Sequence, residues 1–158
     1  MYSHPLFIAL SLVFVTLAPV LYISSYQKRK ARKNLQKFNV LAQANNLKFD
    51  ATESLPLVML GLAASAGKLL VVEVRNADRT TIFDLRDFSS CEIQTIRSKS
   101  GGIDRINLLL EPKHKTGKQQ QILLYDEILE VHPNADVRTK SATRWKELIS
   151  QNIKLNDR

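Results

Sequence analysis

Cysteine, glycine and proline are all scarce in this chain of 158 residues. A single Cys has no partner for an intramolecular disulfide and is too few for a multi-cysteine zinc site. Five Gly and five Pro exclude a collagen-like chain. The rest of the composition, 44% apolar and 24% charged, is ordinary for a globular protein, and the length suits one domain with an appendage.

Acidic residues are absent from the first third of the chain. Residues 1–49 hold seven Lys or Arg and no Asp or Glu, whereas residues 50–158 hold sixteen Lys or Arg and fifteen Asp or Glu. Of the net charge of +8, a share of +7 therefore belongs to the first 49 residues, and the remainder of the chain is almost neutral.

A long uncharged run lies at the N-terminus. Residues 5–25 read PLFIALSLVFVTLAPVLYISS. At a rise of about 1.5 Å per residue, a helix over residues 6–23 would cover roughly 27 Å, close to the hydrocarbon core of a bilayer. A cleaved signal peptide would carry a basic stretch before a shorter apolar core, but the first charged side chain here is Lys28. The sequence therefore predicts a transmembrane anchor over residues 1–26.

Six basic side chains follow the predicted span closely: Lys28, Arg29, Lys30, Arg32, Lys33 and Lys37. Because positive charge stays on the cytoplasmic side, we expect a single-pass protein of a bacterial inner membrane, with its N-terminus outside and its C-terminal domain in the cytoplasm. Residues 27–46 contain no Gly or Pro and are predicted to form a basic juxtamembrane helix. Two interpretations of its cations stay open: binding to anionic lipid headgroups, or a topology signal alone.

Beyond residue 46 the pattern becomes extended, with turn residues between apolar runs. Antiparallel pairing is expected because the connections are short. Six strands are predicted, over residues 55–63, 69–74, 80–85, 91–98, 105–112 and 119–126.

The C-terminal segment is predicted to be an amphipathic helix. Candidate caps are Asn134, Asp136 and Thr139, and the apolar face holds Ala142, Trp145, Leu148 and Ile149. Such a helix would close the open face of the sheet, with Trp145 in the core. The predicted fold class is α+β: a transmembrane helix, then over residues 47–158 a small antiparallel sheet or partly open barrel closed by one helix.

Residues 47–153 resemble bacterial pleckstrin-homology-like domains in two stretches. TTIFDLRDFSSCEIQ at residues 80–94 is similar to their pattern of strand, short connection and strand, and the segment from Ala142 to Leu148 is similar to their closing helix. That family normally has seven strands, and the resemblance implies a binding or scaffold domain. Eukaryotic members often bind phosphoinositides through basic residues in an early loop. The corresponding turn here offers only Lys68, so that activity is not carried over.

Motifs for catalysis and metal binding are weak in this sequence. Gly61 and Gly67-Lys68 are separated by five residues, and Leu69 stands where a phosphate loop needs Ser or Thr, so strand–turn–strand is favoured. Cys91 is predicted to be a small buried residue. The carboxylates of Asp84 and Asp87 are expected to shape a connection rather than act as a pair. No metal site is expected from the histidines His4, His114 and His132, because their spacing does not make them converge. The acidic Asp126, Glu127 and Glu130 are interpreted as a solvated loop or a helix-capping contact.

Together these observations predict a membrane-anchored, non-catalytic binding or scaffold domain with an unknown protein partner and no cofactor. One alternative is a membrane-tethered enzyme or small-ligand receptor with a pocket in the sheet. Another is a subunit of a membrane assembly that packs through its span. Nucleic acid is not expected as a partner, because the basic segment adjoins the bilayer and the remaining chain is almost neutral.

Overall fold

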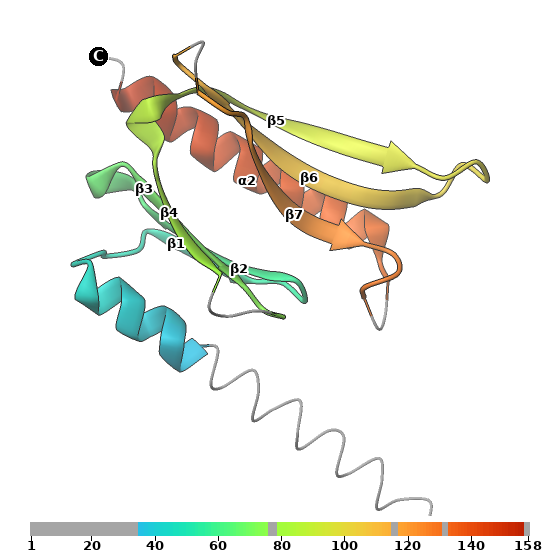
Figure 1. Cartoon of the computed structure of the whole chain (residues 1–158), viewed down its shortest axis with the longest axis horizontal. Coiled ribbons are helices and arrows are strands. Elements are labelled where there is room, and N and C mark those ends of the chain that lie inside the picture. The colour runs from blue at the N-terminus through green and yellow to red at the C-terminus, as the bar shows by residue number, and fades with distance from the viewer. Residues whose placement is uncertain (1–34, 76–78, 115–116, 131–132, 157–158) are drawn as a thin grey trace, which may run out of the picture. The chain divides into compact units, whose positions relative to one another are not determined.

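The computed structural model describes residues 35–75, 79–114, 117–130 and 133–156 (Figure 1). The chain divides into two units, residues 1–39 and 40–158. Within the described residues, no helix combines the length and the apolar character that crossing a bilayer requires. The predicted anchor, residues 1–26, lies outside the described residues.

The predicted juxtamembrane helix, residues 27–46, is described only in its second half. Residues 35–44 are helical, and Lys37 is exposed there. A turn follows at Asn46, whose φ of 51° is left-handed, a conformation that Asn tolerates better than most residues. The amide of Leu47 donates to the carbonyl of Ala42 at 2.8 Å and closes this turn.

In the described part of the chain, seven strands form two antiparallel sheets, where the sequence predicts about six strands in one sheet or partly open barrel. The first sheet has the order β1 (Ala51–Ser54), β2 (Val58–Ala63), β3 (Lys68–Glu73) and β4 (Thr80–Asp84). The second has the order β5 (Phe88–Arg97), β6 (Ile103–Pro112) and β7 (Gln120–Asp126). Among the described residues no strand pairing joins the sheets into a barrel. The missed strand, β1, is four residues long and reads ATES, which gives no apolar alternation.

Two short 3-10 turns correct or confirm predicted connections. The turn η1 (Ala64–Ala66) joins β2 to β3 and ends at Gly67 with φ 63°, which confirms the predicted strand–turn–strand. The turn η2 (Leu85–Asp87) joins β4 to β5 and therefore joins the two sheets. Leu85, predicted to end a strand, lies in η2 with its side chain fully buried. The Asp84 carboxylate accepts a hydrogen bond from the amide of Arg86, so it shapes this connection as expected.

The helix α2 (Ala135–Asn156) runs along the second sheet and contacts all three of its strands (Figure 1). Asn134 caps it, since its Oδ1 accepts from the amide of Val137 at 3.1 Å. Ala142, Trp145 and Ile149 are fully buried in a core that also draws residues from both sheets, which confirms the predicted apolar face.

Candidate binding site between the two sheets

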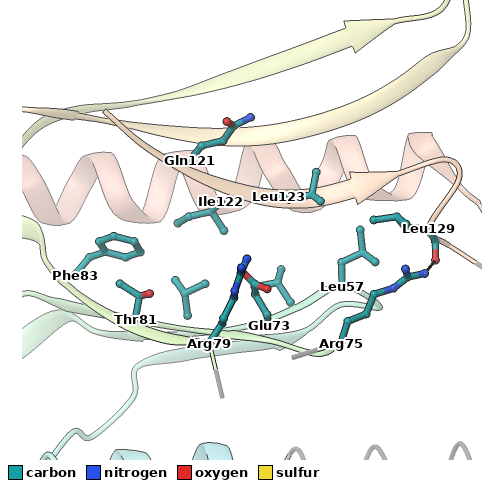
Figure 2. A pocket seen from close by; sticks show the side chains of 12 residues that line it. Leu57, Glu73, Arg75, Arg79, Thr81, Phe83, Gln121, Ile122, Leu123 and Leu129 are labelled. Carbon is teal, nitrogen blue, oxygen red and sulfur yellow. Dashed lines mark hydrogen bonds and ion pairs between the residues drawn. The ribbon is translucent and has the colours of Figure 1, made fainter. Parts of the chain in front are cut away.

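A hollow of about 300 Å³ opens between the two sheets, and we call it the inter-sheet pocket (Figure 2). Its floor is apolar. Side chains from β2, β3 and β4 of the first sheet meet side chains from β7 of the second. Its lining residues are Leu57, Val58, Val71, Glu73, Arg75, Arg79, Thr81, Phe83, Gln121, Ile122, Leu123 and Leu129.

Strand order explains where the pocket lies. β4 and β7 are each the last strand in the order of their sheet, so the pocket lies between two edge strands. Side chains alternate along a strand, which turns Thr81 and Phe83 of β4 to the same face. Phe83 and, from β7, Ile122 extend into the space between the sheets (Figure 2). Phe83 also packs edge to face on the ring of Phe88, with 5.9 Å between centroids, which fixes its orientation.

Charged side chains surround the mouth of the pocket. The Arg75 guanidinium donates to the carbonyl oxygen of Leu129 at 2.6 Å, which ties the end of β3 to the turn after β7. Arg79 lies 4.0 Å from the Glu73 carboxylate, with both side chains well exposed at 73% and 48%. An ion pair this long and this exposed contributes little, so Arg79 can exchange it for an incoming anion. The mouth therefore carries one net positive charge.

This arrangement offers a ligand two kinds of contact. Apolar side chains form the floor, while two guanidinium groups, the Thr81 hydroxyl and the Gln121 amide supply directed hydrogen-bonding groups at the edge. Glu73, the one carboxylate of the lining, is partnered by Arg79. A ligand that combines an apolar group with an anionic group is complementary to both features.

The residues that the sequence offered for nucleophilic catalysis lie elsewhere. Cys91 is 1% exposed in the core, as predicted, and its burial, with a smaller effect of Glu92, raises the pKa of its thiol to about 12. A thiol with so high a pKa is a poor nucleophile at neutral pH. His114 lies in an exposed loop, while His4 and His132 fall outside the described residues. Within the described part of the chain no group of three or more potential metal ligands converges.

Asp126 and Glu130 are buried rather than part of a solvated loop as the sequence predicted, and each has a structural partner. Asp126 binds the Arg105 guanidinium at 2.8 Å and accepts hydrogen bonds from two backbone amides of the turn that follows. Glu130 is buried and pairs with Arg138 of α2 at 3.0 Å. These contacts hold the turn between β7 and α2.

Of the six residues predicted to face lipid, the structure describes one. Lys28, Arg29, Lys30, Arg32 and Lys33 lie outside the described residues, and Lys37 belongs to the other unit.

Two features of this region were not recognised from the sequence. Arg75 and Arg79 were given no role, although they are two cations separated by only three residues. Glu53 was also overlooked, because it lies in β1, the strand that was not predicted. Its carboxylate accepts from the Trp145 indole at 2.6 Å and from the Ser141 hydroxyl at 2.8 Å, and so joins the first sheet to α2.

No family model matches the chain, and no curated protein or solved structure matches it. The function proposed below is therefore argued from sequence and geometry.

Proposed function

We propose that this protein is a single-pass, non-catalytic binding module that captures a segment of a partner protein in its inter-sheet pocket. The observation that carries the proposal is an apolar floor lying between two edge strands beneath Arg75 and Arg79. The uncharged run at residues 5–25 and the cations behind it support an inner-membrane anchor with the domain in the cytoplasm.

A protein segment fits this pocket for two reasons. Edge strands present backbone groups that an extended peptide can pair with, while pockets alongside accept its alternate side chains. The guanidinium groups of Arg75 and Arg79 favour a carboxylate, which they can bind through two donors. The preferred segment therefore places a bulky apolar residue next to Asp, Glu or a C-terminal carboxylate.

The seven strands and the closing helix also support the pleckstrin-homology-like assignment of residues 47–153 as part of this proposal. Seven is the strand number of that family, and the helix follows the last strand as the resemblance implies. We propose this relationship for the fold only, and the choice of ligand rests on the pocket itself.

A small-ligand receptor is the second candidate. Arg75, Thr81 and Gln121 are among the lining residues around an apolar floor, and a volume of about 300 Å³ lies at the lower end of the range for small-molecule sites. A small amphipathic anion would satisfy the same groups, so the experiment must separate the two ligand classes.

Selection from a random peptide library against the full chain in nanodiscs tests the binding proposal. We expect enriched peptides to carry an apolar residue beside a carboxylate. Arg79→Glu should lower the affinity of the protein for these peptides by about tenfold or more. Lys140→Glu, which reverses an exposed cation on α2, should leave them unchanged. Peptides that bind Arg79→Glu equally well would contradict the proposal. Enrichment of no peptide, with thermal stabilisation by small anions that is lost in Arg79→Glu, would favour the receptor.

Membrane flotation and protease protection test the anchor independently. The intact chain should float with vesicles, and the region around Trp145 should be digested only when the cytoplasmic face is open to protease. Recovery of the intact chain in the soluble fraction would contradict the anchor while leaving the pocket proposal to the peptide experiment.

A further inference from the structure

A second hollow, of about 270 Å³, lies where β5 ends, β6 begins and β7 turns towards α2. We call it the acidic hollow, and its lining residues are Ile96, Asp104, Arg105, Asp126, Glu127 and Ile128. Strand register brings them together, because Arg105 of β6 is paired with Ile96 on one side and with Asp126 on the other.

Apolar side chains are unusually exposed at this hollow. Ile96 is 40% exposed and Ile128 is 87% exposed. Isolated apolar residues on a surface are ordinary, but two long ones lining the same hollow indicate a contact surface. Few large apolar residues are exposed in the described part of the chain: Leu35, Val40, Ile96, Ile128, Val137 and Leu155.

The turn that carries Ile128 is held firmly. The amide of Ile128 donates to the Asp126 carboxylate at 3.0 Å, and the amide of Glu127 donates to the carbonyl of Asp104 at 2.9 Å. The carbonyl of Leu129 in turn receives the Arg75 guanidinium. A side chain presented from an ordered turn costs less conformational entropy on binding than one in a loose loop.

Negative charge dominates the acidic hollow. Arg105 compensates Asp126 at 2.8 Å, but the described residues supply no ion pair to Asp104 or Glu127. Three carboxylates against one guanidinium leave two net negative charges. The carboxylates also act on the neighbouring Tyr125. Burial is the main reason that its pKa is raised, and the nearby carboxylates, above all Glu127, raise it further.

We propose that the acidic hollow is a second docking surface, which binds a basic segment of a partner protein. An apolar side chain of that segment packs between Ile96 and Ile128, and its Lys or Arg side chains lie beside Asp104 and Glu127. Charge complementarity selects this occupant, because an acidic segment would be repelled by the two uncompensated carboxylates. The surface shares no residue with the inter-sheet pocket and has the opposite charge, so the domain holds two segments of different chemistry.

The test uses the full chain in nanodiscs of purely zwitterionic lipid, so that basic peptides do not bind the bilayer. The main probe is a fluorescent Lys-Lys-Leu-Lys-Lys peptide. Two controls are Glu-Glu-Leu-Glu-Glu, with reversed charge, and Lys-Lys-Ser-Lys-Lys, without the apolar anchor. We expect saturable binding of the first peptide that weakens with added salt, and binding of the controls at least about tenfold weaker.

Variants then assign the binding to the acidic hollow. Glu127→Lys and Ile128→Ser should each lower the affinity for the main probe by about tenfold or more. The first removes the negative charge, and the second removes the apolar contact. Both positions are exposed, so emission from the single, buried Trp145 should stay unchanged and show that the domain is folded.

Arg79→Glu separates this proposal from the function proposed above, because it alters the inter-sheet pocket alone. It should leave the basic probe unaffected. No saturable binding to the unsubstituted chain, equal binding of the acidic probe, or full binding to Glu127→Lys would each overturn the acidic hollow as a docking surface.

Discussion

The inter-sheet pocket and the acidic hollow are nearly equal in volume, at about 300 and 270 Å³, but they differ in how they depend on the core. Val58 and Ile122 line the inter-sheet pocket and also belong to the hydrophobic core, where they are 2% and 3% exposed. The acidic hollow has Ile128, 87% exposed, on a surface turn.

Because of this difference, binding and stability depend on the same residues in the inter-sheet pocket but on different residues in the acidic hollow. The floor of the inter-sheet pocket consists partly of core residues, so a change to these side chains also changes the folding free energy. A hollow made by a turn and two strand ends can change its side chains at little cost to folding. Four predictions test how sharply the interior and the surface differ.

The largest expected contrast is in thiol reactivity. Because burial raises the pKa of Cys91 to about 12, its thiolate fraction at pH 8 should be about a thousandfold lower than that of an ordinary cysteine. A cysteine introduced by Ile128→Cys, in a chain that also carries Cys91→Ala, should instead react at an ordinary rate. Labelling of both proteins with a chromogenic disulfide reagent measures the ratio.

Denaturant provides the control for this comparison, since unfolding should bring the two rates together. Fast labelling of native Cys91 would show that the core around β5 opens frequently, and the distinction between interior and surface would then be weaker than the structure indicates.

Two isoleucines give the next contrast. Ile122→Ala removes a buried side chain from the floor of the inter-sheet pocket and should destabilise the domain by about 2–4 kcal/mol. Ile128→Ala removes the same atoms from an exposed turn and should change stability by less than about 0.5 kcal/mol. Urea unfolding followed by Trp145 emission measures both values. Equal losses in the two variants would mean that Ile128 is buried in solution, contrary to the structure.

The sequence predicted most of the strands, but not the division into two sheets. Apolar runs mark β2, β3, β6 and β7, because several residues of each enter the core. In β2 and β3 both faces are buried, which explains their continuous rather than alternating pattern. Nothing comparable marks β1, whose pairing with β2 is a tertiary contact that its own four residues do not indicate. The first sheet ends before η2 and the second begins after it. Leu85 is apolar and was therefore predicted to continue the strand, but it has the conformation of a turn.

The two candidate sites were less predictable for a different reason. Each gathers residues that are far apart in the chain, so their proximity depends on strand order. The inter-sheet pocket brings Arg79 near Gln121, and the acidic hollow brings Ile96 near Ile128. One local signal was present at Ile128, a long apolar residue directly after Asp126 and Glu127 at the end of the last strand.

Glu53 provides a smaller stability effect that links the first sheet to α2. Glu53→Ala leaves the buried Trp145 indole without its acceptor and should cost about 1–3 kcal/mol. Glu53→Gln keeps an acceptor and should recover part of that loss. Glu73→Ala is the matched control, because it removes an exposed carboxylate at the mouth of the inter-sheet pocket and should cost less than about 0.5 kcal/mol. Equal effects of Glu53→Ala and Glu73→Ala in thermal unfolding would show that the link from β1 to α2 contributes nothing.

The smallest effect concerns the surface pair at the connection between the two sheets. The hydrogen bond from the Arg86 guanidinium is the main reason that the pKa of Asp84 is lowered below 3.8. A carboxyl whose pKa is lower in the folded state stabilises the fold above its unfolded pKa, and this stabilisation disappears as the pH falls through the lowered value. Because the Arg86 side chain is exposed and Asp84 is only partly buried, water screens the pair, and Asp84→Asn should cost less than about 1 kcal/mol at pH 7 and almost nothing at a pH below the lowered pKa. Urea unfolding at both pH values measures the change, with Asp87→Asn as the control, since exposed Asp87 acts on Arg86 through its charge, whereas Asp84 also accepts a hydrogen bond from it. If Asp84→Asn lowered the free energy of unfolding more at acid pH than at pH 7, the sign of the prediction would be wrong. The ion pair at the connection between the two sheets would then not stabilise the fold.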